Sequence, residues 1–311
     1  MRIFIVIPVH NHVEETLQCL NSLTCQAGPA YSLLVVDGGS TDGTSLRIRE
    51  AYPQVTVVPG DASLWWTGAT AMGVDHALGT ARPGDFVLFL NNDTQVGPDF
   101  LAKLVACSER HGRALVGSLN VAMADPTVVV DGGVHWDWAA VQSRQLPMEP
   151  GKLDTDRVTT LSGRGLLVPV EVFERIGNLD VRRLPHYAAD YEFSMRAARA
   201  GFRLAFSYEA VVRVNTEITG REGDLATPVG LVEAWHLLFS RRSIRNVFNR
   251  LRFVSAACPS EYRMRNYAAI LAASVWLMTN VPVAYQIKYG LLRCVLPTRL
   301  KTWMRKRKLL A

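Results

Sequence analysis

The sequence lacks the features that define several protein classes. Its five cysteines are scattered and form no Cys-x-x-Cys pair, so a disulfide scaffold is excluded, and we expect reduced thiols in a cytosolic protein. No internal repeat and no low-complexity stretch occurs. The apolar run after Arg2 ends early, at Pro8 and the polar His10 and Asn11, which is not the pattern of a signal peptide. A content of 49% hydrophobic and 20% charged residues excludes a disordered or collagen-like chain.

Acidic residues are almost missing from the C-terminal part of the chain. Residues 241–311 contain 15 Lys and Arg against one acid, Glu261, and therefore carry +14, whereas the whole chain carries +6. The first 240 residues must then carry 6 − 14 = −8. An acidic body with a basic tail indicates a polyanion or an anionic membrane surface as a partner of the tail.

The first 120 residues alternate between predicted strands and helices. β-Branched or apolar runs predict buried strands at 3–7, 33–36, 55–58 and 86–90, and apolar spacing predicts helices at 13–24, 46–51 and 68–78. This alternation predicts an α/β fold with a parallel sheet. Further on, we expect short strands at 114–119, 127–134 and 158–168 and a helix at 189–200, followed by a helical, aromatic and basic region after about 228.

Polar clusters follow three of the predicted strands, where ligands of parallel sheets bind. They are Pro8 to Asn11, Asp37 to Asp42 and Asn91 to Asp93. The third cluster suits Mg²⁺ or Mn²⁺ held together with phosphates, or is a turn that caps its strand. Asp37 either hydrogen-bonds a ribose or a base edge, or caps the following helix.

Three later segments also carry candidate chemistry. Asp190 and Glu192 lie among Tyr187, Tyr191 and Phe193, an apolar setting that could raise a carboxyl pKa toward that of a useful base; the alternative is a helix start that favours acids. Gly163-Arg164-Gly165 indicates backbone close to a ligand with an Arg contact, or a β-bulge. Trp65-Trp66-Thr67-Gly68 offers an indole that could stack on a base or a sugar, or that belongs to the core.

Taken together and in this order, these motifs resemble the family 2 glycosyltransferases with the GT-A fold, over roughly residues 1–220. Within the family, segments 65–68, 163–165 and 185–193 resemble a bacterial subset that includes rhamnosyltransferases. The resemblance implies a GT-A domain at 1–228, with a Rossmann-like nucleotide-sugar half (1–120) and an acceptor half (121–228). It implies a mixed sheet, followed by a C-terminal helical region at 229–311.

The resemblance also implies roles for the candidate residues. Asp190 would be the catalytic base of an inverting hexosyltransferase, and Asp93 would bind the divalent cation, Mn²⁺ or Mg²⁺. Donor contacts would come from Pro8, His10, Asn11, Asp37, Trp66, Gly68, Asn92 and Asp93. Acceptor or other contacts would come from Gly163, Arg164, Gly165, Tyr187, Glu192 and Arg213. Arg213 or Arg221 could neutralise the leaving diphosphate.

The implied reaction moves a sugar from a UDP- or dTDP-sugar to a hydroxyl of a glycan or of a lipid-linked acceptor. It would serve the synthesis of cell-surface polysaccharide or lipid-linked glycan, in the cytoplasm at the inner face of the membrane. A sugar-phosphate nucleotidyltransferase is disfavoured, because residues 9–12 replace the Gly-rich loop that such an enzyme would need after its first strand. A non-catalytic nucleotide- or glycan-binding protein on the same fold stays open. No nucleic-acid partner is expected, given the acidic body, and the sequence does not indicate an oligomeric state.

The basic tail contains an uncharged stretch, 266–287, which is nominally long enough to span a bilayer. Asn280, Pro282 and Gln286 interrupt it, so we expect an interfacial helix pair rather than a span, with aromatic and basic residues at the headgroups. A soluble helical cap or a dimer interface is the alternative.

Overall fold

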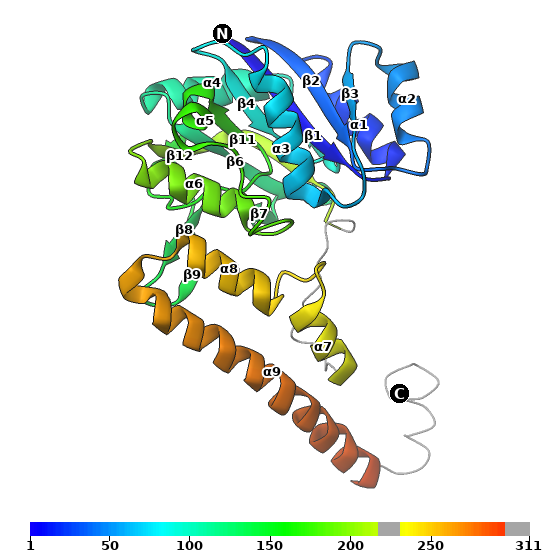
Figure 1. The fold of residues 1–311 in the computed structure, drawn as a ribbon, viewed down its shortest axis with the longest axis vertical. Helices are drawn as coiled ribbons and strands as arrows, with labels where there is room; N and C mark the ends of the chain where they lie inside the picture. The colour runs from blue at the N-terminus through cyan, green and yellow to red at the C-terminus, as the bar shows by residue number, and fades with distance from the viewer. Residues whose placement is uncertain (217–230, 296–311) are drawn as a thin grey trace.

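The computed structural model describes residues 1–216 and 231–295, with residues 231–232 and 280–295 described as backbone only. An α/β body precedes three C-terminal helices (Figure 1). The strands are β1 (Arg2–Val9), β2 (Ala30–Asp37), β3 (Thr56–Pro59), β4 (Phe86–Phe89), β5 (Thr94–Val96), β6 (Leu115–Ala122), β7 (Val129–Asp131), β8 (Val134–Asp137), β9 (Gln142–Gln145), β10 (Asp154–Thr155), β11 (Leu166–Pro169) and β12 (Leu204–Val214). The helices are α1 (Val13–Leu23), α2 (Thr44–Ala51), α3 (Trp65–Leu78), α4 (Phe100–Arg110), α5 (Val170–Ile176), α6 (Ala189–Arg199), α7 (Leu231–Phe239), α8 (Val247–Ala257) and α9 (Ser260–Val295).

One mixed sheet runs through the body in the order β10-β12-β6-β11-β4-β1-β2-β3. Strands β4, β1, β2 and β3 are parallel neighbours, β11 lies antiparallel between β4 and β6, and β6 is parallel to β12. The parallel half is the Rossmann-like part that the sequence predicts. The mixed α/β architecture is therefore confirmed. The expected boundary near residue 228 lies outside the described residues.

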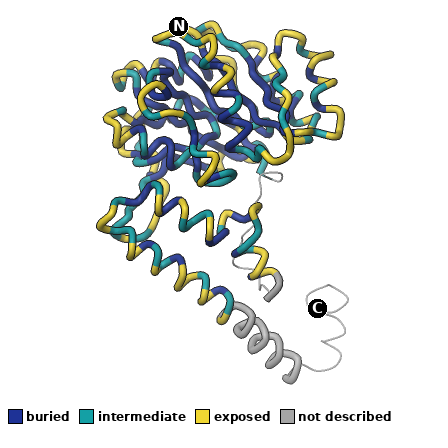
Figure 2. The backbone as a smooth tube through the Cα atoms, viewed as in Figure 1, coloured by how far each residue is buried: buried dark blue, intermediate teal, exposed yellow. Residues whose placement is uncertain are grey.

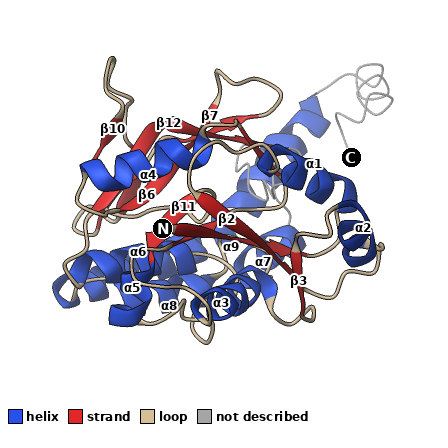
Figure 3. Cartoon of the chain, turned by 90° about the horizontal axis from the view of Figure 1, so that it is seen from above, coloured by secondary structure: helices blue, strands red, loops and turns tan. Residues whose placement is uncertain are grey.

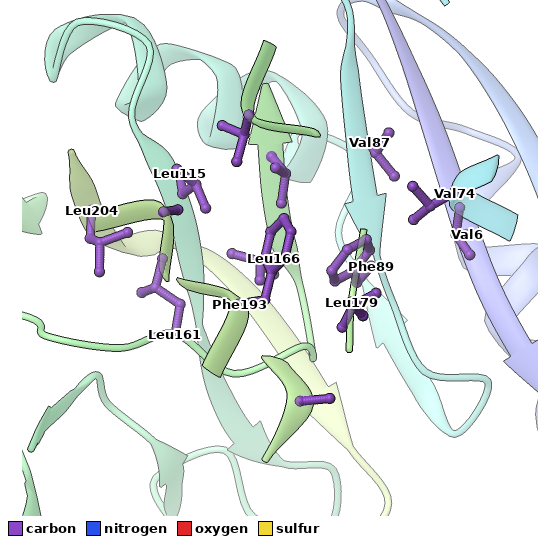
Figure 4. Close-up of a cluster of buried hydrophobic side chains, with 14 of the residues drawn as sticks. Val6, Val74, Val87, Phe89, Leu115, Leu161, Leu166, Leu179, Phe193 and Leu204 are labelled. Carbon is purple, nitrogen blue, oxygen red and sulfur yellow. The ribbon is translucent and has the colours of Figure 1, made fainter. Parts of the chain in front are cut away.

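Side chains of β1 alternate between the two faces of the sheet, and each face has its own core. Ile3, Ile5 and Ile7 pack with residues of α1, α2 and α4, whereas Phe4 and Val6 pack with residues of α3, α5 and α6. Figure 3 shows these helices on opposite sides of the strands, and Figure 4 shows the second core around Phe89. Burial on both faces explains why the first strand is a continuous apolar run.

Helix α3 approaches the sheet closely because Gly73 has no side chain. A Cβ at this position would lie 2.4 Å from Cγ1 of Val6 and 3.0 Å from Cγ2 of Val36. The close approach brings the first turn of α3, with Trp65 and Trp66, to the edge of the sheet where β1 and β4 end.

Some expected elements differ from the structure. The strand expected at 158–168 is wrong over most of its length, since only Leu166–Pro169 is a strand. Gly165 has a φ of +86°, a left-handed conformation that ends regular pairing there. The expected strand at 127–134 is divided between β7 and β8. Helices α4 and α5 and strand β12 were not predicted.

The C-terminal helices dock on the body through aromatic contacts and hydrogen bonds. The ring of Trp136 on β8 and that of Trp138, just after β8, lie 5.0 and 5.6 Å from the ring of Phe253 on α8. The side-chain amide of Asn266 on α9 donates to the carbonyl oxygen of Trp138 at 2.9 Å. Arg199 on α6 donates to the carbonyl oxygens of Ala256 and Ala257, at the end of α8.

The uncharged stretch 266–287 is part of one helix, α9, so the expectation of a helix pair there is wrong. Within the described part of the chain, no helix combines the length and the apolarity needed to cross a bilayer. Many residues of α7–α9 are exposed (Figure 2). These helices and the loop between α7 and α8 carry half of the large hydrophobic side chains that are exposed in the described residues. These are Trp235, Ile244, Phe248, Met264, Leu271, Val275 and Trp276.

Candidate functional site

The ends of β1 and β2 form a cradle of hydrogen bonds. Pro8 is buried opposite Val36, and Asp37 ends β2 in register with Val9. His10 Nδ1 lies 2.8 Å from the carbonyl oxygen of Gly38. Asn11 joins the second loop twice: its backbone N–H donates to Ser40 Oγ at 2.7 Å, and its Oδ1 accepts from the N–H of Thr41 at 2.9 Å.

Asp37 is almost fully buried, with 6% of its surface exposed. Its carboxylate accepts from the backbone N–H of Ser40 at 2.8 Å and from the hydroxyl of Ser45. The carboxylate thus fixes the loop after β2 and the start of α2. Its remaining lone pairs are what a ribose or a base edge would use.

The segment after β4 lies beside this cradle, because β4 is the other neighbour of β1. Asn92 donates from Nδ2 to Thr16 Oγ1 on α1 at 3.0 Å. Asp93 is 9% exposed, and its Oδ1 is a buried oxygen without a hydrogen-bond partner in the described residues. Burial raises the pKa of Asp93, and the nearby Arg164 opposes this shift.

Trp66 connects the end of β4 to Asp190. Its indole N–H donates to Asn91 Oδ1 at 2.9 Å. A Cβ on Gly163 would lie 2.5 Å from the six-membered ring of Trp66 and 3.4 Å from Cβ of Asp190, so Gly163 fits between these two side chains. The N–H of Gly163 donates to Asp190 Oδ2 at 2.6 Å. No other residue type would allow this close approach.

Asp190 is the second residue of α6. Its Oδ1 accepts from the N–H of Tyr191 at 2.9 Å, so each carboxylate oxygen receives one N–H and keeps lone pairs free. Burial raises the pKa of Asp190 above the usual range of a carboxyl group, although these N–H donors and Arg164 oppose the shift. A raised pKa is a property of a general base that works near neutral pH.

Arg164 is the cation shared by three acidic side chains. Its positive charge favours the ionised forms of Asp93, Asp131 and Asp190, which come from three separate segments of the chain. Its guanidinium makes no hydrogen bond or ion pair with any described residue. The N–H groups of this guanidinium are therefore available to a ligand phosphate.

Gly165 holds this loop in place. Its N–H donates to the carbonyl oxygen of Phe89 at 2.9 Å, and Ser118 Oγ donates to its carbonyl oxygen at 2.6 Å. A Cβ on Gly165 would lie 2.5 Å from Ser118 Oγ. Residues 163–165 are thus anchored to β4 and β6, and this holds Arg164 where its charge acts on both Asp93 and Asp190.

The residues around Asp93 fit a divalent cation. A buried carboxylate oxygen without a hydrogen-bond partner is a suitable ligand for Mg²⁺ or Mn²⁺, which bind oxygen donors.

A second group of possible ligands, Cys107, His111 and Asp154, has donor atoms within 4.8 Å of one another. Burial raises the pKa of Cys107 to about 12, and Asp154 already accepts from Arg110 and His111, so this group is explained as an ion-pair cluster.

Three predicted residues, Glu192, Tyr187 and Gly68, take part in other contacts. Glu192 is buried in an ion pair with Arg196 at 3.0 Å, and Arg196 also donates to the carbonyl oxygens of Ile176 and Asn178, so Glu192 holds α6 to α5. Tyr187 donates from its hydroxyl to the carbonyl oxygen of Arg242 at 3.0 Å. Arg213 is exposed on β12, Gly68 packs near Leu64 and Val181, and Arg221 lies outside the described residues.

The sequence did not indicate Asp131 as a site residue, and it did not predict the hydrogen bond between Asn91 and Trp66. Asp131 is 7% exposed, and its Oδ1 accepts from the N–H of Gly133 at 2.9 Å. Burial raises the pKa of Asp131, while Gly133, Arg164 and Ser162 oppose the shift. The Asp-Gly-Gly sequence at 131–133 is typical of a turn, and only the fold shows that its carboxylate lies near Arg164.

Comparison with known proteins identifies related sequences. A family model described as Glycosyl transferase family 2 matches residues 4–176, more than half of the chain. Glycosyltransferase AglE of Haloferax volcanii is 26% identical over 257 residues, which are 78% of this chain and 77% of that protein. An N-acetylglucosaminyl-diphospho-decaprenol L-rhamnosyltransferase of Mycobacterium tuberculosis is 29% identical over 238 residues, 68% of this chain and 74% of that protein.

Solved structures share the fold. GalNAc-T7 with UDP, GalNAc and Mn²⁺ superposes with a TM-score of 0.59 at 17% identity, covering 93% of this chain and 57% of that one. S. aureus TarS, residues 1–349, has a TM-score of 0.56 at 16% identity and covers 93% and 92%. At these identities the likeness concerns the fold, which is the GT-A fold.

Proposed function

The chain belongs to the family 2 glycosyltransferases, and from this premise we propose that it is an inverting enzyme that moves a sugar from a UDP- or dTDP-sugar to a hydroxyl of a lipid-linked or polysaccharide acceptor. One observation carries the proposal. The Gly163-Arg164-Gly165 loop donates a hydrogen bond to Asp190, a carboxylate with a raised pKa, and the charge of Arg164 acts on Asp93, a buried carboxylate with an oxygen free for a cation. A base and a phosphate-neutralising centre are the two parts that a direct displacement needs.

In the proposed reaction, Asp190 accepts the proton of the acceptor hydroxyl through one of its free lone pairs. The acceptor oxygen forms a bond to the anomeric carbon while the bond from that carbon to the phosphate oxygen breaks. The nucleoside diphosphate leaves with the electron pair, and a single displacement inverts the anomeric configuration. Trp66 and Gly163 limit the space beside Asp190 and so orient the sugar toward it.

Arg164 neutralises charge on the leaving diphosphate. Asp93 would hold a divalent cation, which would supply further positive charge to the diphosphate. Arg164 contributes a permanent charge with planar donors that match phosphate oxygens. Asp37, Pro8, His10 and Asn11 would hold the base and ribose in the cradle between β1 and β2.

Nucleotide binding tests the donor assignment. We expect UDP or dTDP with Mn²⁺ to stabilise the protein, by roughly 2.7 kcal/mol at about 100 times the dissociation constant, and GDP and CMP to stabilise it less. The measurement is the thermal unfolding midpoint with each nucleotide, first with Mn²⁺ and then with EDTA. Loss of the shift in EDTA would support a cation on Asp93, and a shift that persists would assign the neutralisation to Arg164. No shift with any nucleotide, from folded protein, would contradict the donor assignment.

We further propose that α7–α9 dock on an anionic membrane surface. Their exposed apolar side chains lie on helices that are rich in Arg, and residues 241–252 contain five Arg and no acid. Interfacial helices combine these two features. The protein should sediment with vesicles that contain phosphatidylglycerol at low salt and be released at high salt, but should not bind neutral phosphatidylcholine vesicles. Equal behaviour with both vesicle types would contradict the proposal.

A further inference from the structure

A cavity of about 320 Å³ lies between the body and the C-terminal helices. Its walls come from the start of α3, from the loop before α6, and from α8 with the loop that precedes it. The lining residues are Trp65, Arg182, Pro185, His186, Arg241, Asn246, Asn249 and Arg252. No motif that the sequence analysis assigned to the donor, apart from the start of the Trp65-Trp66 segment, reaches this cavity.

The charge of the cavity wall is entirely positive. Arg182, Arg241 and Arg252 line it, and no acidic residue does. Within residues 1–216 and 231–279, the structure gives the guanidinium groups of these three arginines no hydrogen bond and no ion pair. Three guanidinium groups that line one cavity, with no acid among them, give it a positive electrostatic potential. Such a potential favours an anion with several oxygens.

Uncharged donors and an aromatic ring complete the wall. Asn246 caps the N-terminus of α8, the positive end of that helix, by accepting from the N–H of Asn249 at 2.9 Å. His186 has a buried Nδ1 without a hydrogen-bond partner, and its ring lies 5.2 Å from that of Trp65. Burial lowers the pKa of His186 to about 4, and Arg242 acts in the same direction, so the ring is neutral at neutral pH.

The cavity shares its wall with the loop that leads into Asp190, residues 185–188. The N–H of Thr67, next to Trp66, donates to the carbonyl oxygen of Pro185 at 3.3 Å, and residues 185–188 lead directly into Asp190. Asn249 on α8 donates to the carbonyl oxygen of Tyr187 at 3.1 Å, which fixes α8 against this loop. A molecule that extends from the cavity toward Asp190 could bring its hydroxyl to this carboxylate, as the acceptor must.

Exposed apolar side chains stand close along the chain to residues that line the cavity. Ile244 and Phe248, which are 61% and 56% exposed, flank the lining residues Asn246 and Asn249 along the chain. An anion held here would lie near exposed apolar side chains and next to the loop that leads into Asp190. That arrangement matches a molecule with a lipid tail, a diphosphate and a sugar, in this order.

We propose that the cavity formed by Trp65, His186 and the three arginines binds the diphosphate of a membrane-anchored, isoprenoid-linked acceptor. This inference rests on the proposed function and specifies its acceptor. The donor diphosphate belongs at Asp93 and Arg164, at the carboxyl ends of the strands, so the two diphosphates have separate sites. The relative from Mycobacterium tuberculosis is named for a diphospho-decaprenol acceptor, which is the same chemistry.

Binding of a short isoprenoid diphosphate tests the proposal without requiring turnover. The probes are farnesyl diphosphate, the neutral alcohol farnesol and inorganic diphosphate, each titrated calorimetrically into the full chain. We expect farnesyl diphosphate to bind more tightly than either of the others. Arg182→Ala and Arg252→Ala should each weaken its binding about tenfold, because each removes a charge-assisted contact. Both side chains are exposed and without a partner in the described residues, so both variants should fold.

Arg49→Ala is the matched control, since it removes an exposed arginine from α2, on the opposite half of the body. It should leave the affinity for farnesyl diphosphate unchanged. UDP and dTDP affinities should be the same in all four proteins. Unchanged farnesyl diphosphate affinity in both cavity variants would overturn the proposal, and so would loss of nucleotide affinity, which would assign the cavity to the donor.

The remaining outcomes distinguish a lipid diphosphate from a small free anion, and a failure of this proposal from a failure of the proposed donor. Inorganic diphosphate that binds as tightly as farnesyl diphosphate would show a small-anion site and overturn the lipid assignment. Farnesyl diphosphate binding that depends on the arginines, in a protein that binds no nucleotide, would support the cavity and contradict the donor instead. The two failures are therefore distinguishable.

Discussion

Replacing Asp190 with Asn should lower kcat by about 10³-fold while the affinity for the nucleotide stays within about twofold. The amide cannot accept the proton of the acceptor hydroxyl at neutral pH, but it is nearly the same size and can still accept from the N–H of Gly163. The cradle between β1 and β2 and the Asp93 site are untouched by this change. Initial rates of sugar transfer, together with calorimetric titration of UDP or dTDP, measure the two quantities separately.

Glu192→Gln is the matched control, because it changes the other acid of the same motif. Glu192 is 4% exposed and is paired with Arg196, so its loss should reduce the free energy of unfolding by about 2–3 kcal/mol. The turnover of the molecules that remain folded should change by less than about threefold, since the side chain does not contact Asp190. Full turnover in the Asp190 variant, or loss of turnover in the Glu192 variant alone, would show that the assignment of Asp190 as the base is wrong.

The pH profile gives the same assignment a second readout. Asp190 must be ionised to accept a proton, and its pKa is raised by burial, so kcat/KM should fall as the pH drops through a value above the ordinary aspartate pKa of about 3.9. Arg164 opposes this rise. Arg164→Gln should therefore shift the acidic limb of the profile to still higher pH, whereas a purely structural role of Arg164 would leave the position of the limb unchanged.

Much of the fold could be predicted because local and global signals agree in the first half of the chain. The run at 3–7 is apolar on both faces, and the structure buries both faces of β1. Helix α5 could not be predicted from the sequence, because seven residues are too few to show a clear helical spacing of apolar side chains. Strand β12 is buried over most of its length, yet the half-buried Glu209 and the exposed Arg213 interrupt its apolar pattern.

The site was predictable where a residue ends a strand, and less so where loops pass one another. Asp37 and Asp93 follow buried runs, and such positions meet at the edge of a parallel sheet. The contact of Gly163 with Trp66, by contrast, joins residues that are far apart in the sequence through the antiparallel insertion of β11 beside β4. The arginine cavity requires the docking of α8 on the loop before α6. No local pattern in either segment specifies that docking.

Replacing Asp93 with Asn should have opposite effects on stability and on cation-dependent binding. The carboxylate is buried and its Oδ1 has no hydrogen-bond partner in the described residues, so the ionised group destabilises the cation-free fold. The neutral amide should raise the free energy of unfolding of cation-free protein by about 1–3 kcal/mol at neutral pH. The stabilisation that Mn²⁺ gives to the complex with UDP or dTDP should be lost.

The dependence of this gain on pH follows from the sign of the pKa shift. Burial raises the pKa of Asp93 above its value in the unfolded chain, so the folded state loses stability as the pH rises above about 4 and Asp93 ionises. The gain from Asn should accordingly grow as the pH rises through the raised pKa of Asp93, and vanish at low pH, where the carboxyl is protonated in both the folded and the unfolded state. Asp125→Asn, at an exposed position, is the control and should show neither effect. A destabilised Asp93 variant that keeps its response to Mn²⁺ would mean that the carboxylate serves the fold rather than a cation.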